Sequence, residues 1–192
     1  MGIVENYKKF LHEFEDHLSL IKKKAILIGV SKTKPLSDIL DLYSVGHRDF
    51  GENYAQELRD KIKNFPSSLQ GVNWHYIGQL QRNKVKYIAG KTSLIHTVDD
   101  IKKADFINDY CVSRNLIQPI LLQVNISCDS SKAGSRLDDV GQLYSKALQL
   151  SGLEIKGLMT ITKYSSNPED SRNYYKIMKQ LAMDLENKHG KK

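Results

Sequence analysis

Apolar residues along this chain follow two alternating patterns. Short, nearly continuous apolar runs such as residues 25–30 are typical of strands buried on both faces of a parallel sheet. Longer stretches with apolar residues at three- and four-residue steps are typical of helices that cover such a sheet. The predicted strands are 25–32, 48–54, 73–78, 93–98, 118–127 and 154–160, and the predicted helices are 3–21, 37–43, 56–64, 83–89, 101–113, 137–151 and 170–188.

After the first helix, a strand and a helix follow one another six times. Such alternation predicts an α/β fold with a parallel sheet and helices outside it. Two arrangements fit, an open doubly wound sheet and a (β/α)₈ barrel of the TIM type. No Gly-x-Gly-x-x-Gly motif follows the first predicted strand, which counts against a dinucleotide-binding open sheet. With 192 residues, the chain is long enough for one core, and we predict a single domain over residues 1–192.

Polar residues stand at the carboxyl end of every predicted strand. Active sites of both arrangements collect at this end of the strands. In a barrel, all six ends would converge on one mouth. The residues are Ser31 and Lys32, Glu52 and Asn53, Gly78 and Gln79, His96 and Thr97, Asn125 and Ser127, and Thr160 and Thr162.

Lys32 is the first candidate for chemistry, because it ends the first apolar strand. Pro35 follows closely, stops the ladder and suits the first turn of a helix. We expect the stem of Lys32 to lie in apolar surroundings, which favour the neutral amine over the ammonium. A neutral amine is a nucleophile for Schiff-base formation with an aldehyde or ketone. The alternative is a lysine that buries its stem and extends its charge into water.

Composition narrows the classes of function. The hydrophobic share of 40% and the charged share of 27% are ordinary for a globular protein, and no apolar run reaches the roughly 18 residues of a membrane span. The two cysteines, Cys111 and Cys128, lack metal-site spacing and suggest a reducing, cytoplasmic location. The net charge of +7 is dispersed over the chain, so we do not expect a nucleic-acid partner.

Six motifs, in this order, make the chain resemble the pyridoxal phosphate homeostasis proteins. That family is similar in fold to the amino-terminal barrel domain of alanine racemase, and the resemblance covers nearly the whole chain. The motifs are Val30-Ser31-Lys32-Thr33-Lys34-Pro35, Asp49-Phe50-Gly51-Glu52-Asn53-Tyr54, Trp74-His75-Tyr76-Ile77-Gly78-Gln79-Leu80-Gln81 with Asn83-Lys84, Gln123-Val124-Asn125-Ile126, Ser131-Lys132-Ala133-Gly134 and Gly157-Leu158-Met159-Thr160.

The resemblance implies a barrel that binds pyridoxal 5′-phosphate as a Schiff base on Lys32. By the same resemblance, Asn53 lies near the cofactor, and Ile77 and Met159 pack around its ring. His75, His96 and Asn125 stand at matching strand ends and complete the predicted cofactor-binding set. For the two histidines, the alternative is that they are hydrogen-bonded polar groups at the barrel rim. Lys132 is a candidate second amine for the aldehyde, and Lys34 is expected at the surface.

Only about six of the eight βα units of such a barrel are recognisable in the sequence. The loops after strands seven and eight often hold phosphate in this fold, and no segment here matches them. We therefore expect a truncated chain, or one completed by a partner or a second copy. We also expect pyridoxal phosphate to bind through Lys32 more weakly than in a complete barrel.

The leading hypothesis is a non-catalytic carrier. It would hold pyridoxal phosphate inside the cell and pass it to apo-enzymes that depend on this cofactor. The alternatives are a racemase- or decarboxylase-like amino-acid enzyme and a remnant with impaired cofactor binding. A racemase of this fold needs a second base opposite the lysine, and no segment of the chain is recognised as its source. The sequence leaves the oligomeric state open.

Overall fold

The computed structural model describes residues 2–189. It contains one sheet of six strands whose spatial order is β1-β2-β3-β4-β5-β6, with every neighbouring pair parallel. The strands are β1 (Gly29–Val30), β2 (Asp49–Glu52), β3 (Asn73–Tyr76), β4 (Leu94–Val98), β5 (Gln118–Gln123) and β6 (Leu153–Met159). The helices are α1 (Ile3–Leu20), α2 (Leu36–Ser44), α3 (Ala55–Asn64), η1 (Arg82–Lys84), α4 (Val85–Ile88), α5 (Ile101–Val112), α6 (Leu137–Ala147), η2 (Pro168–Ser171) and α7 (Arg172–His189).

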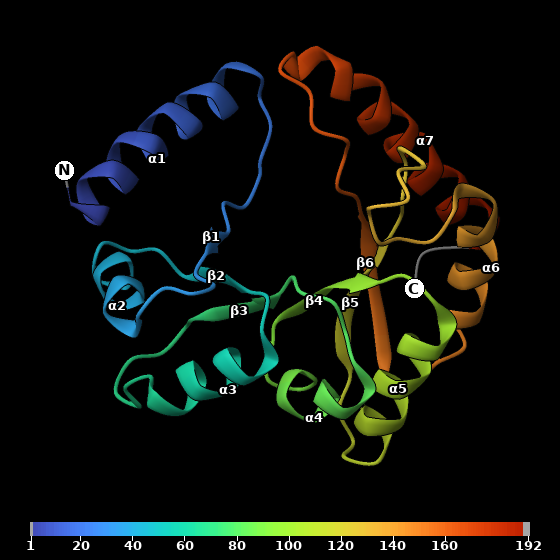
Figure 1. Ribbon diagram of the computed structural model, residues 1–192, viewed down its shortest axis with the longest axis horizontal. Helices are drawn as coiled ribbons and strands as arrows, with labels where there is room; N and C mark the ends of the chain where they lie inside the picture. Colours follow the sequence, from blue (N-terminus) through green and yellow to red (C-terminus); the bar gives the residue numbers. More distant parts are fainter. Residues whose placement is uncertain (1, 190–192) are drawn as a thin grey trace.

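The strand order decides between the two arrangements that the sequence allows. In a doubly wound sheet the chain reverses direction across the sheet, so sequential strands do not all lie side by side. Here each strand pairs with the next one in sequence, as in a barrel. The sheet curves, and the helices from α2 to α6 lie outside the curve (Figure 1). The barrel-type prediction with six βα units is therefore confirmed for the described residues.

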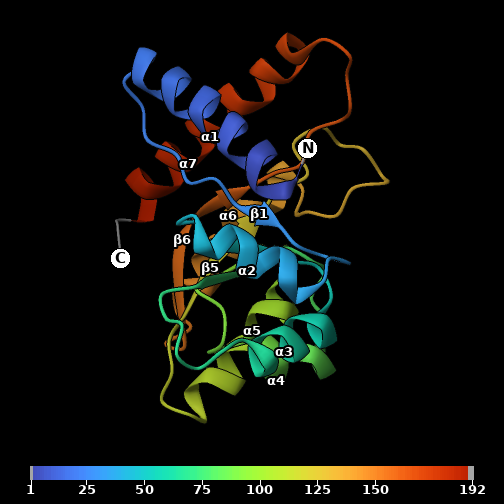
Figure 2. The same ribbon diagram turned by 90° about the vertical axis from the view of Figure 1, so that its left-hand side faces the viewer.

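The core lies between the outer face of the sheet and these helices. Phe50, Ile95 and Ile120 project from strands, Leu58 and Ile107 project from α3 and α5, and none is more than 1% exposed. Each such side chain contributes about 1.5–3 kcal/mol through burial. Helices α1 and α7 stand at the same end of the molecule in both views (Figures 1 and 2). They flank the two edges of the sheet, which are formed by β1 and β6.

The prediction of a long first strand buried on both faces is wrong. β1 has only two residues, and Ile26, from the same apolar run, is 72% exposed. The physical reason is its position at the sheet edge, where only β2 supplies hydrogen bonds. β5 is also shorter than predicted and ends at Gln123; Val124 still donates to the Met159 carbonyl of β6 and also forms a bridge with Ser135.

Candidate functional site

The register of the first three strands shows which of their residues lie side by side on one face of the sheet. Val30 pairs with Gly51, and Gly51 pairs with His75. A Cβ atom on Gly51 would lie 3.0 Å from Cδ1 of Ile77 and 3.1 Å from Cγ2 of Ile28. Those two side chains therefore lie on the same face of the sheet as Gly51, which is the concave face away from α2 and α3.

Lys32, Asn53 and Ile77 come two residues after the members of that paired row. Asn53 and Ile77 directly follow β2 and β3, where side chains two apart share a face, whereas Lys32 lies in the turn after β1. The N–H groups of Ser31 and Ile77 each donate to a carbonyl oxygen of β2 over 2.9 Å, which carries the register one residue beyond the strands. Three of the predicted cofactor-binding residues thus come directly after, or in the turn after, neighbouring strands β1, β2 and β3.

Lys32 does not have the apolar surroundings that we expected from the sequence. The residue is exposed, and Val30 on the same edge strand is 53% exposed. β1 pairs only with β2, so no second strand covers Lys32. Lys32 instead lies in a turn that closes with a hydrogen bond of 3.0 Å from the N–H of Lys34 to the carbonyl of Ser31. Its amine is therefore accessible to a ligand from solvent.

Asn53 has an unusual buried acceptor. Its Oδ1 atom is buried and has no hydrogen-bond partner among the described residues. The backbone here is tightly packed, because a Cβ on Gly78 would lie 1.9 Å from the Asn53 carbonyl oxygen. A buried amide oxygen without a donor costs about 1–3 kcal/mol. Such an atom fits a ligand that brings its own donor.

His75 is the penultimate residue of β3, and His96 lies in the middle of β4. His75 Nε2 is 3.1 Å from Oδ1 of Asp49, and His75 Nδ1 is 3.0 Å from Nε2 of His96. With Asp49 as the acceptor, His75 donates from Nε2 and accepts from His96. Burial, followed by the charge of His75, lowers the pKa of His96 to about 4. The alternative of hydrogen-bonded polar groups describes this pair, and its cofactor contact stays a prediction.

The last two predicted residues are farther from Lys32. Asn125 donates from Nδ2 to the carbonyl oxygens of Asp129 and Lys132 at 2.8 and 3.0 Å, so its amide holds the loop after β5. Met159 is the last residue of β6, and four strands separate β6 from β1. Strand pairing therefore does not bring either residue to the Lys32 turn.

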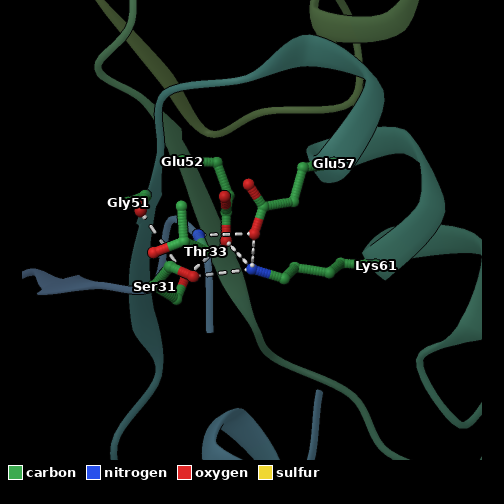
Figure 3. A network of polar contacts seen from close by, with 6 residues as sticks. All are labelled: Ser31, Thr33, Gly51, Glu52, Glu57 and Lys61. Atoms are coloured by element: carbon green, nitrogen blue, oxygen red, sulfur yellow. Dashed lines mark hydrogen bonds and ion pairs between the residues drawn. The ribbon is translucent and has the colours of Figure 1, made fainter. Parts of the chain in front are cut away.

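Sequence reasoning missed an ionic network beside Lys32 (Figure 3). Lys61 Nζ lies 2.6 Å from Oε1 of Glu52, 2.7 Å from Oε1 of Glu57 and 2.6 Å from the carbonyl oxygen of Ser31. Ser31 Oγ donates to the same Glu52 oxygen over 2.6 Å. The Glu52 side chain is fully buried and that of Lys61 is 8% exposed. Burial raises the pKa of Glu52, while the hydrogen bonds from Lys61 and Ser31 oppose the rise.

Part of this network had a sequence signal. Glu57 and Lys61 stand four residues apart on the predicted third helix, the spacing of a helical ion pair. Nothing local links them to Glu52 or Ser31, which come from two different strands. Among residues 2–189 we find neither a cluster of side chains placed to hold a metal ion nor a helix with the length and apolar character that a membrane crossing needs.

Comparison with known proteins places this architecture in a family. The family model described as alanine racemase, N-terminal domain, matches residues 7–192. The chain is 36% identical over 165 residues to the pyridoxal phosphate homeostasis protein of Aquifex aeolicus. This alignment covers 86% of this chain and 72% of that protein. It is also 36% identical over 158 residues to the Escherichia coli K12 protein of that name, covering 82% of this chain and 66% of that protein.

A solved structure gives the same result. PipY of Synechococcus elongatus, in a structure described as having pyridoxal phosphate bound, superposes with a TM-score of 0.82 at 25% sequence identity. The match covers 97% of this chain and 83% of PipY. The strand order, the sequence motifs and these matches all indicate the same family. The chain belongs to the pyridoxal phosphate homeostasis protein family and carries the N-terminal domain of alanine racemase.

Proposed function

We propose that this chain binds pyridoxal 5′-phosphate reversibly as a Schiff base on Lys32 and takes part in intracellular homeostasis of that cofactor. The observation that carries the proposal is the pairing of an accessible amine, at the carboxyl end of β1, with the orphaned buried oxygen of Asn53 on the next strand. The names of the relatives and the cofactor described in PipY support it.

The residues at this edge suit the groups of the cofactor. The amine of Lys32 would hold the aldehyde, Oδ1 of Asn53 would accept a hydrogen bond from a donor on the ring, and Ile77 would supply an apolar contact. When bound, the cofactor supplies an electron-withdrawing ring to an attached amino group. Met159, His75, His96 and Asn125 remain predicted contributors to the same site.

Lys32 needs no other reactant to hold an aldehyde. Its neutral amine would bond to the aldehyde carbon, and the carbonyl oxygen would leave as water with the two amine protons. Because Lys32 is exposed, water also has access for the reverse reaction. Easy reversal supports a carrier that releases the cofactor to apo-enzymes, which are its proposed partners.

The titratable groups on the concave face support a carrier over a racemase-like enzyme. A racemase needs a base that accepts a proton near neutral pH. His96 has a pKa of about 4 and is therefore a weak base at that pH. His75, its neighbour, is held between His96 and Asp49. An enzyme of amino-acid metabolism remains the second candidate, favoured only by the alanine racemase domain itself.

The test is titration of the chain with pyridoxal phosphate, followed by borohydride reduction and peptide mapping. We expect visible absorbance and a reduced adduct on Lys32. Lys32→Ala should abolish both, and Lys34→Ala, a change at another exposed lysine of the same turn, should keep both. A wild-type adduct that peptide mapping places on other lysines and not on Lys32 would refute the assignment, and turnover of L-amino acids by the loaded wild-type chain would favour the enzyme.

A further inference from the structure

The ionic network holds the backbone on both sides of Lys32. On one side, Lys61 Nζ donates to the carbonyl oxygen of Ser31 over 2.6 Å. On the other side, the N–H of Thr33 donates to Oε1 of Glu57 over 2.7 Å. Both anchoring side chains come from α3 (Figure 3). The turn that carries the amine is therefore attached to a helix as well as to the sheet.

Lys61 uses its whole donor capacity in this network. An ammonium has three N–H groups, and the three acceptors in reach are Ser31 O, Glu52 Oε1 and Glu57 Oε1, at 2.6, 2.6 and 2.7 Å. Hydrogen bonds to charged groups are the stronger kind. The buried ammonium thus joins the end of β1, the end of β2 and the first turn of α3 at one point.

The backbone of the turn gives an independent reason for such an anchor. Thr33 has a φ of +62°, a left-handed conformation that is unfavourable for a β-branched residue. Residues in such conformations persist when their surroundings over-determine them. The β1 ladder is two residues long and ends before the turn, so it cannot supply this constraint. The Glu57 carboxylate accepts the hydrogen bond of Thr33 itself.

We propose that Glu57 and Lys61 are positioning residues, which hold the Ser31–Lys34 turn so that the Lys32 amine is presented to an aldehyde at the concave face. The inference rests on the proposed function of Lys32. Neither residue needs to touch the cofactor, because each acts through the backbone next to Lys32. Loosening the turn leaves the amine present but lets it sample orientations that do not react, so affinity falls without loss of the nucleophile.

The test uses Glu57, because its side chain is 23% exposed and is easier to replace than Lys61. Glu57→Ala removes the acceptor for the Thr33 N–H, whereas Glu57→Gln keeps an oxygen at that position. Gln56→Ala is the matched control, an exposed neighbour in the same turn of α3. Two quantities are measured in each full-length variant. The first is amide hydrogen exchange at Thr33 and Lys34. The second is the ratio of pyridoxal phosphate adduct on Lys32 to adduct on Lys34 after borohydride reduction, which we call the Lys32 preference.

We expect Glu57→Ala to speed exchange at Thr33 and Lys34 and to weaken pyridoxal phosphate binding and the Lys32 preference about tenfold, the effect of losing one strong hydrogen bond. Glu57→Gln should restore most of this, and Gln56→Ala should match wild type. Unchanged exchange in Glu57→Ala would overturn the inference, as would faster exchange with unchanged binding and preference. If wild type itself shows no preference for Lys32, the proposed function fails, and with it the inference.

Discussion

Replacing Lys61 with methionine tests the buried network most directly. Methionine has a similar length but no charge, so the Glu52 carboxylate would stay fully buried with Ser31 Oγ as its remaining donor. Its second oxygen, Oε2, already has no partner among the described residues. Removing one partner of a buried ion pair costs about 3–5 kcal/mol, because an uncompensated charge is left behind. We expect Lys61→Met to lower the free energy of unfolding by about that amount near pH 8.

The free energy of unfolding that Lys61→Met loses should be smaller at low pH than at high pH. Burial already raises the pKa of Glu52 above its ordinary 4.5, against the opposing effect of Lys61. Without Lys61 the pKa rises further, so the folded variant binds a proton that the unfolded chain releases. The stability tied to this proton is present below pH 4.5 and is lost as the pH rises through the folded pKa. Lys61→Met should therefore be closer to wild type near pH 5 than near pH 8.

Urea unfolding at the two pH values measures this, with circular dichroism and the fluorescence of the single tryptophan, Trp74, as probes. The control is the double variant Glu52→Gln/Lys61→Met, which removes both charges and keeps an acceptor for Ser31. It should recover part of the loss near pH 8 and show a weaker pH dependence. A Lys61→Met protein within about 1 kcal/mol of wild type near pH 8, or a deficit equal at both pH values, would refute the reasoning.

Three further predictions concern residues outside the ionic network. Gly78→Ala should cost about 3 kcal/mol in urea unfolding, because its Cβ would meet the Asn53 carbonyl at 1.9 Å, whereas Gly141→Ala, in open space within α6, should stabilise by up to ~1 kcal/mol. Asn53→Leu should leave the free energy of unfolding unchanged or raise it by about 1 kcal/mol, because it removes the buried oxygen that lacks a donor. It should nevertheless weaken pyridoxal phosphate binding in an absorbance titration. Unchanged binding would argue against the cofactor role of Asn53. Because the pKa of His96 is lowered to about 4, the stability that this residue contributes is present above pH 6.5 and is lost as the pH falls towards about 4, by up to ~3 kcal/mol. His96→Gln should therefore flatten that part of the curve of unfolding free energy against pH. An unchanged slope would contradict this.

The family and the order of the elements could be predicted from the sequence. Alternating apolar runs and amphipathic stretches predicted six strand–helix units, and all six are present in the described residues. The motifs predicted the family, which the comparisons confirm. Local chemistry also defines a helix end, where Asp100 caps α5 by accepting a hydrogen bond from the N–H of Lys103. These features depend on residues close together in the chain, so periodicity and spacing reveal them.

Burial at the site could not be predicted in this way. The run before Lys32 is as apolar as a buried strand, but burial depends on how many neighbours the strand has, and β1 has one. The position of His75 and His96 below the rim likewise follows from where β3 and β4 end. The hydrogen bonds by which the Asn125 amide holds its loop form only when residues 125–132 fold back, so no local pattern reveals them.

The sequence by itself determined the order of the strands and helices, because hydrophobic periodicity and chain order are local properties. Only the tertiary structure decided that Lys32 lies in an exposed turn, that Asn53 keeps a buried oxygen without a donor, and that Lys61 joins two strands to α3. The physical reason is that exposure, hydrogen-bond satisfaction and ion pairing depend on atoms brought together from distant parts of the chain.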